Sequence, residues 1–195
     1  MKKLLITGAT AVALLTGAYA DNTGTYSDDP VQDNTGRKGF VLGLGAGFGS
    51  LSLENGEFDS LNDFDEFGFV TSFEIGYAFT NQFSVTYINN VTWASGDSIY
   101  GSDTNIGGFS GISANYYFED APETLYVVGG DGLTTFANFD SGDGDSGTGF
   151  LIGGGYAMEH VEFEVDAIFG EVDTILGDDT RDMFTIQATV SYRFY

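Results

Sequence analysis

The chain has 195 residues, of which 29 are acidic and only six are Lys or Arg, and it contains no cysteine. The formal net charge of −23 argues against a basic patch that would bind nucleic acid or anionic headgroups. Without disulfides, packing and backbone hydrogen bonding must hold the fold together. The 29 glycines, 18 Phe and 11 Tyr, beside only two prolines, favour strands over helices.

The first residues have the features of an export signal. Residues 1–20 begin with two lysines, continue with an uncharged stretch and end in Ala18-Tyr19-Ala20, which predicts a signal peptide cleaved after Ala20. The uncharged stretch is shorter than the ~20 apolar residues of a spanning helix, and no later segment has about 18 uninterrupted apolar residues, which excludes a helical membrane protein. Cleavage would leave 175 residues with a formal charge of −25 (4 − 29). Residues 21–38 are polar and aperiodic, which predicts a flexible periplasmic leader.

From Gly39 the chain divides into eight segments of alternating polarity. Side chains of a strand point alternately to opposite faces, so Met183 to Phe194 places aromatic and aliphatic residues on one face and Thr, Gln, Ser and Arg on the other. Ile88 and Asn89 break the alternation of the third segment, and the phase of the fifth stays open. The predicted strands are 39–50, 67–79, 83–93, 107–118, 124–136, 148–157, 161–170 and 183–194.

Long and short connections alternate along these segments. The predicted long ones are 51–66, 95–105, 137–147 and 171–182, and the short ones are 81–82, 119–123 and 158–160. This alternation is typical of an up-and-down barrel in an outer membrane, where only a closed sheet satisfies every backbone group. The face rich in Gly, Ser and Thr suits the narrow lumen of eight strands. The predicted fold is therefore all-β: an eight-stranded antiparallel up-and-down transmembrane β-barrel over 39–195, with ten strands left open if part of 51–66 pairs.

The signal peptide, the Gly-rich first segment, the eight alternating segments and the ending Val190 to Tyr195 resemble the small outer-membrane β-barrel families. These are typified by OmpX, the OmpA transmembrane domain and the Opa-like opacity proteins, and the resemblance covers Gly39 to Tyr195. It implies a place in the cell outer membrane, reached through the periplasm, in contact with lipid and lipopolysaccharide. It also implies a terminal aromatic signal for the barrel-assembly machinery. Tyr192 and Phe194 have the spacing of that signal, and Tyr195 follows them as the last residue.

An even number of strands and a periplasmic leader would place the four long connections outside the cell. These connections are rich in acidic residues, which favours a solvated, repulsive rim. A sharper hypothesis is a divalent-cation site at Asp140, Asp143 and Asp145, since hard cations prefer several carboxylate oxygens. The segment lacks the spacing and the closing Glu of an EF-hand.

Four carboxylates are predicted to face the lumen: Glu74, Glu162, Glu164 and Asp166. Buried carboxylates are costly without partners, and Arg193 is the only basic residue within a predicted strand. A register that faces Glu162 with Arg193 keeps both side chains on the inner face, so we expect this ion pair near the periplasmic end. A structural pair in a plugged barrel is the simpler interpretation, and a gate is the alternative.

Some small outer-membrane barrels are lipid A deacylases or acyltransferases that use His with Ser or Asp. The sole histidine, His160, lies in the predicted turn before the seventh strand, and no nucleophile is indicated within its reach. We therefore expect no enzyme and no cofactor. The leading interpretation is a monomer with a structural or surface-interaction role and acidic extracellular loops. The alternatives are a small porin that passes ions or small solutes and a secreted soluble β-barrel binder.

Overall fold

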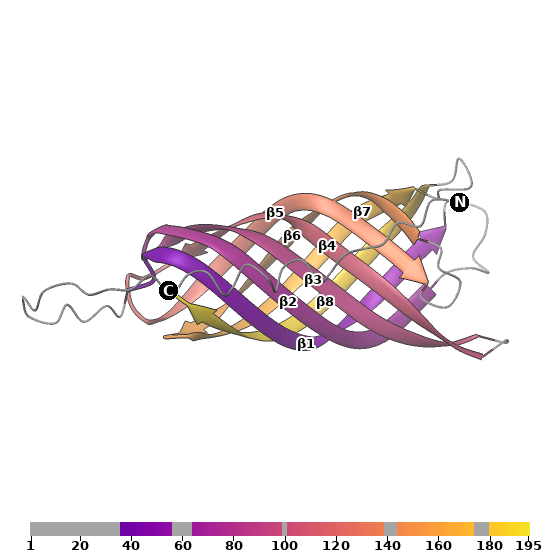
Figure 1. The fold of residues 1–195 in the computed structure, drawn as a ribbon, viewed down its shortest axis with the longest axis horizontal. Helices are drawn as coiled ribbons and strands as arrows, with labels where there is room; N and C mark the ends of the chain where they lie inside the picture. Colours follow the sequence, from indigo (N-terminus) through magenta and orange to yellow (C-terminus); the bar gives the residue numbers. More distant parts are fainter. Residues whose placement is uncertain (1–35, 56–63, 99–100, 139–143, 174–179) are drawn as a thin grey trace, which may run out of the picture. The chain divides into compact units, whose positions relative to one another are not determined.

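The computed structural model describes residues 36–55, 64–98, 101–138, 144–173 and 180–195. Each strand is antiparallel to its neighbours, and β8 pairs with β1, so the sheet closes into a barrel of eight strands (Figure 1). The strands are β1 (Gly39–Asn55), β2 (Phe64–Thr80), β3 (Phe83–Ser98), β4 (Gly101–Tyr117), β5 (Glu123–Asn138), β6 (Gly144–Met158), β7 (Val161–Asp173) and β8 (Thr180–Phe194). The predicted all-β, eight-stranded antiparallel barrel is confirmed. The predicted signal peptide (1–20) and the leader as far as residue 35 lie outside the described residues.

The two ends of the barrel differ in their connections. At one end, which we call the turn end, β1 begins, β8 ends, and short turns at 81–82, 118–122 and 159–160 join the strands. The opposite end is the loop end. Within the described ranges, no helix is long and apolar enough to cross a membrane.

Several strands reach farther toward the loop end than the sequence predicts. β3 ends at Ser98 and β4 begins at Gly101, with Asp97 paired to Ser102, so the long connection predicted over 95–105 is wrong. Residues 51–55 and 64–66 also pair, but as extensions of β1 and β2 rather than as additional strands, which answers the question of ten strands. The predicted strands stopped where polar residues interrupt the apolar alternation. Backbone pairing does not depend on side-chain polarity, and it continues beyond that point.

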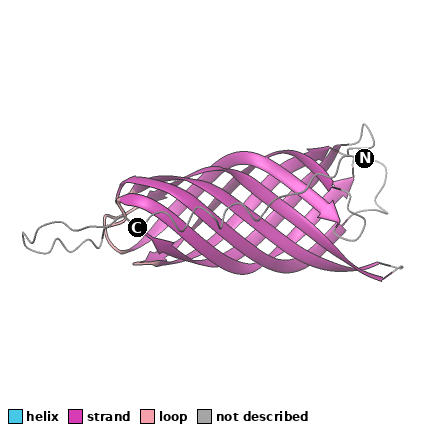
Figure 2. Ribbon diagram, viewed as in Figure 1, coloured by secondary structure: helices cyan, strands magenta, loops and turns pink. Residues whose placement is uncertain are grey.

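The strands are inclined to the barrel axis, as Figure 2 shows. A row of directly paired residues that starts at Phe40 and passes once around the sheet returns to β1 at Ser50, ten residues (50 − 40) nearer the loop end. Closure of a sheet with such a stagger requires tilted strands. Ten residues over eight strands is about one residue per strand. Side chains at equal height on neighbouring strands are therefore displaced by about one residue from direct pairing.

The outer face of the barrel is apolar. Phe67 is 70% exposed, and Phe, Tyr, Leu, Ile and Val side chains on all eight strands share this outward direction. β3 follows the same alternation, because Ile88 is buried while Asn89 faces outward, so the predicted break is a change of polarity and not of direction. In β5, Leu125, Val127 and Leu133 face outward. A mainly apolar exterior suits lipid and argues against the alternative of a secreted soluble barrel.

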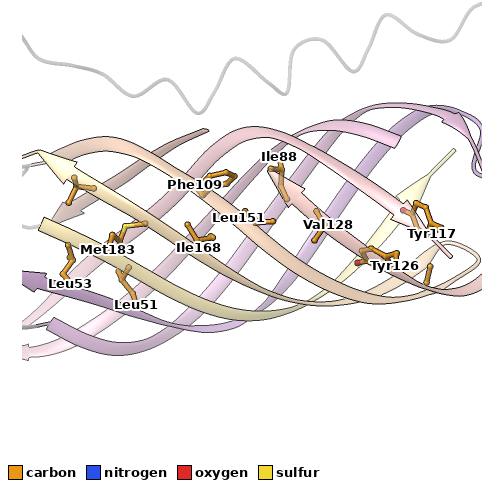
Figure 3. Close-up of a cluster of buried hydrophobic side chains, with 12 residues drawn as sticks. Leu51, Leu53, Ile88, Phe109, Tyr117, Tyr126, Val128, Leu151, Ile168 and Met183 are labelled. Atoms are coloured by element: carbon orange, nitrogen blue, oxygen red, sulfur yellow. The ribbon is translucent and has the colours of Figure 1, made fainter. Parts of the chain in front are cut away.

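The lumen is filled by side chains of two kinds. Figure 3 shows Leu51, Leu53 and Met183 toward one end of a buried apolar cluster and Tyr117 and Tyr126 toward the other. Tyr117 lies at the turn end, since its backbone N–H donates to the turn residue Gln82. The apolar members that fill the part of the lumen between these ends are Ile88, Phe109, Val128, Leu151 and Ile168. The charged residues of the lumen and their hydrogen-bond partners form the site described next.

Candidate functional site

Arg193 is the centre of a buried ion-pair network. Its position on β8 directs the side chain into the lumen, where it is 1% exposed. Its Nη2 lies 2.7 Å from Oε2 of Glu74 on β2, and its Nη1 lies 3.1 Å from Oε2 of Glu162 on β7. One guanidinium thus joins two carboxylates on two other strands. Such a fork suits Arg, whose planar group presents several donors at once.

The contact between Arg193 and Glu74 passes over β1, the strand between them. Gly43 pairs directly with Arg193 on one side and with Glu74 on the other. A Cβ at Gly43 would lie 3.2 Å from the Cβ of Glu74 and 3.4 Å from the Cγ of Arg193. The missing side chain therefore leaves the space in which the two charged groups meet.

The register of the last hairpin differs from the predicted one. Glu162 pairs directly with Ser191, and the backbone N–H of Arg193 donates to the carbonyl of His160 in the turn. The ion pair between Arg193 and Glu162 is therefore diagonal, and the direct register that we predicted is wrong by two residues. Both registers keep the two side chains on the inner face, because strand direction repeats every second residue.

Three tyrosines complete the network. The hydroxyl of Tyr117 donates to Oε1 of Glu162 at 2.9 Å and accepts a hydrogen bond from Nη1 of Arg193. The hydroxyl of Tyr195 donates to the same Oε1 at 3.0 Å. Burial, followed by the nearby Glu162 carboxylate, raises the pKa of Tyr195 to about 12, so this phenol keeps its proton and remains a donor. The last residue of the chain, predicted as part of an assembly signal, thus contacts the lumen network.

The other two predicted lumen carboxylates have neutral partners. The hydroxyl of Tyr126 donates to Oε2 of Glu164 at 2.8 Å, and Nε2 of Gln187 donates to Oδ2 of Asp166 at 3.0 Å. Within the described part of the chain, the ion pairs of Arg193 are those with Glu74 and Glu162. The five predicted lumen residues therefore divide into an ion-pair triad and two carboxyl groups held by neutral donors.

Arg37 covers the turn end of this network. Its guanidinium carbon lies 4.3 Å from the centre of the Tyr117 ring, and Nη2 donates to the carbonyl of Pro122 at 2.6 Å. The backbone N–H of Lys38 donates to Oδ1 of Asn81 at 3.1 Å. Arg37 is buried by these contacts. Arg37 and Lys38, which were predicted to belong to the flexible leader, thus pack against two turns of the barrel.

Arg181 lies within β8, so the prediction that Arg193 is the only basic residue in a strand is wrong. The strand was predicted from Met183 because the apolar alternation starts there. β8 begins three residues earlier, at Thr180, in a polar stretch.

The remaining predicted residues lie elsewhere. Tyr192 and Phe194 face outward at the turn end, with ring centres 4.8 Å apart, and their role as an assembly signal stays a prediction. Asp145 pairs with Phe136 on β5, whereas Asp140 and Asp143 lie outside the described residues. No group of three or more potential metal ligands occurs among the residues that the structure describes. The divalent-cation hypothesis stays a prediction.

His160 lies in the two-residue turn between β6 and β7. Its Nδ1 is 3.1 Å from the carbonyl oxygen of Arg193, and its ring centre is 5.5 Å from that of Tyr192. These contacts tie the turn to the end of β8. The absence of enzymatic activity stays a prediction.

Comparisons with solved structures agree with this fold. The sequence matches no protein-family model and no curated protein sequence. The structure is similar to Ail, the attachment invasion locus protein of Yersinia pestis, with 13% identity and a TM-score of 0.52, over 80% of this chain and 99% of that one. It is also similar to Neisserial surface protein A, with 18% identity and a TM-score of 0.53, over 80% of this chain and 97% of that one. At these identities the likeness concerns the fold. The closed eight-stranded sheet and these likenesses show that the chain has the fold of the small eight-stranded β-barrels found in outer membranes, and its apolar outer face suits that environment.

Proposed function

We propose that this protein is a structural, non-conducting barrel of the outer membrane that presents an acidic face to the outside of the cell. The observation that carries the proposal is the filled lumen, in which two different barriers lie in series along the barrel axis. Each barrier alone opposes the passage of a hydrated ion.

The first barrier is the ion-pair network near the turn end. Arg193 joins Glu74 and Glu162 inside the lumen, and Tyr117 contacts Arg193 through its hydroxyl and the covering Arg37 through its ring. Opening this layer would separate buried charges from their partners. Such separation is strongly unfavourable, because it leaves each charge desolvated and uncompensated.

The second barrier is apolar and lies farther from the turn end. Phe109, Leu151 and Ile168 are buried side chains from three different strands (Figure 3). An apolar constriction excludes water and therefore ions. This layer does not depend on Arg193, which supports a permanently closed lumen rather than one closed by a single gate.

The loop end supports an acidic outer face. Glu171, Asp173 and Asp182 are exposed on β7 and β8 beyond the apolar outer residues of these strands. We place this end outside the cell. The turn end, where β1 begins and β8 ends, then lies in the periplasm. Exposed carboxylates at the rim keep the outer face solvated and suit a surface-interaction role.

A small porin is the second candidate. Side-chain oxygens of Asn90, Asn115 and Gln187 are buried without a hydrogen-bond partner among the described residues. Polar atoms of this kind can bind water in a protein interior, so they support a hydrated path along part of the lumen. The apolar layer of Phe109, Leu151 and Ile168 argues against this interpretation, because it would interrupt such a path.

Planar-bilayer recordings distinguish the two candidates. We expect no conductance steps from the wild-type protein, and none from Arg193→Ala, because the apolar layer remains in place. Arg181→Ala is the matched control, since it removes the other arginine of β8. Steps from the wild type would favour the porin. Steps from Arg193→Ala alone would identify the ion pair as a gate and contradict a permanently closed lumen.

A further inference from the structure

Four polar side chains interrupt the apolar outer face of β2 to β5. They are Thr71, Asn89, Ser110 and Asp131, one on each strand. Each lies between outward apolar residues of its own strand; Asp131, for example, is followed by the outward Leu133 and preceded by Val127 and Gly129. The four residues, which we call the polar row, therefore lie within the surface that faces lipid.

The polar row is nearly horizontal. Asn89 pairs directly with Ser110, whereas Thr71 pairs with Val91, so that Thr71 and Asn89 are diagonal neighbours. Ser110 pairs directly with Leu133, which makes Asp131 its diagonal neighbour. A row of directly paired residues moves toward the loop end by about one residue per strand. Each of the two diagonal steps goes two residues back toward the turn end and so offsets that movement. The four side chains consequently lie at nearly one height around one side of the barrel.

Hydrogen bonding within the barrel satisfies only part of the polar row. Nδ2 of Asn89 donates to Oγ of Ser110, and Nε1 of Trp93 donates to Oγ1 of Thr71 at 3.2 Å. An amide group carries two N–H donors, so one of Asn89 is left over. In the part of the chain that the structure describes, no group hydrogen-bonds to the carboxylate of Asp131, which is exposed on the outer face. Hydrocarbon offers no partner to either group.

The opposite side of the barrel has no such row among its described residues. At the corresponding height β1, β7 and β8 present Ala46, Ala167 and Ala188, which are compatible with lipid. Two residues from Asp131 on the same strand, the outward position Gly129 carries no side chain. Between transmembrane helices, small residues next to polar ones let backbones approach closely and polar groups pair. The same physical reasoning applies to two barrel walls that meet in a bilayer.

We propose that a second copy of this chain covers the polar row, in a dimer whose two-fold axis runs along the membrane normal beside Ser110. β4 is flanked by β3 and β5, so this axis places β3 of one subunit against β5 of the other. A rotation about the membrane normal preserves height. The free N–H of Asn89 therefore meets the carboxylate of Asp131 of the partner subunit, and the reverse pair forms by symmetry. A hydrogen bond to a carboxylate is among the stronger ones. This proposed dimer differs from the monomer expected from the sequence.

Single cysteines can map the contact cleanly, because the chain has none of its own. The full-length protein is expressed to the outer membrane with Ser110→Cys, or as two co-expressed forms with Asn89→Cys and Asp131→Cys, and treated with a membrane-permeant oxidant. Ala188→Cys, at similar height on the opposite side, is the control. We expect a disulfide-linked dimer from Ser110→Cys and from the mixed pair, and only background from Ala188→Cys. Equal yields from Ser110→Cys and the control, or a product containing a different polypeptide, would overturn the proposal.

A second variant tests the proposed hydrogen bond separately from folding. Asp131→Leu makes the outer face more compatible with lipid, so the barrel is expected to assemble and to keep heat-modifiable gel mobility. In that background the cross-linking of Ser110→Cys is expected to fall to the level of the Ala188→Cys control. Undiminished cross-linking in a folded Asp131→Leu barrel would show that the pairing of Asn89 with Asp131 does not hold the dimer together.

Discussion

Replacing Arg193 with Met is expected to lower the free energy of unfolding by about 3–5 kcal/mol, the usual cost of removing one partner from a buried ion pair. Arg193, Glu74 and Glu162 are all at most 4% exposed, so the two carboxylates would stay desolvated without their cation. Tyr117 and Tyr195 would still donate to Glu162, but a phenol supplies no positive charge. Glu74 would lose both contacts that Nη2 of Arg193 makes with its carboxylate oxygens.

Urea unfolding of the barrel from lipid vesicles measures this effect. Arg181→Met is the matched control on β8 and is expected to cost less, because Arg181 is more exposed than Arg193. The triple variant Arg193→Met, Glu74→Gln, Glu162→Gln removes all three charges together and is expected to recover much of the loss, since neutral replacements of a buried ion cluster are often tolerated. A single variant as stable as the wild type would contradict a stabilising role for the network.

Val165→Arg is expected to destabilise the barrel by about 2–4 kcal/mol, the cost of a cationic side chain near the centre of the lipid-facing surface. Val165 is 55% exposed and stands in the middle of the outward run Val161, Phe163, Val165, Ala167 and Phe169. Its guanidinium would meet hydrocarbon on the outside and could not reach the lumen through the sheet.

The same substitution four residues earlier on β7 provides the control. Val161 follows the turn at 159–160, close to the edge of the apolar surface, where the cost falls to about 0–1 kcal/mol. The free energy of unfolding from vesicles should therefore be similar for the wild type and Val161→Arg and clearly lower for Val165→Arg. Equal losses at both positions would mean that the apolar exterior does not follow the depth profile of a bilayer.

The alternation of side chains was enough to predict the eight strands, and the two faces of those in which it is regular. In β8 every apolar residue from Phe184 to Phe194 faces outward, and Arg193 faces inward, as the period of two requires. The same rule fails to fix register, because a shift of two residues preserves both faces. For that reason the direct partner of Glu162 was predicted as Arg193 and is Ser191.

Contacts between distant strands were beyond the reach of the sequence. The pair of Arg193 and Glu74 joins residues 119 positions apart and depends on the missing side chain of Gly43, which no pattern along one strand reveals. Tyr117 had a visible signal, since it follows Gly111, Ser113 and Asn115 on the predicted inner face. Its partners, Glu162 and Arg193, come from strands that closure of the barrel brings near.

The phase of β5 stayed open for a reason that bears on the dimer. Gly129, Gly130 and Gly132 surround Asp131, so the middle of the strand has no apolar residue by which to assign its faces. Only the ladder with β4 and β6 shows that Asp131 points outward, between Ile112 and Phe150. From the sequence alone, a charged residue in a barrel strand would ordinarily be assigned to the lumen, because charge is unfavourable on the lipid-facing side.

Membrane fractionation combined with gel mobility can establish whether this chain is an integral outer-membrane barrel. We expect the full-length protein to sediment with the outer membrane, to resist extraction by urea, and to migrate faster before boiling than after it, because the closed sheet stays folded in detergent. Recovery in the soluble periplasmic or secreted fraction, with a mobility that boiling does not change, would contradict it.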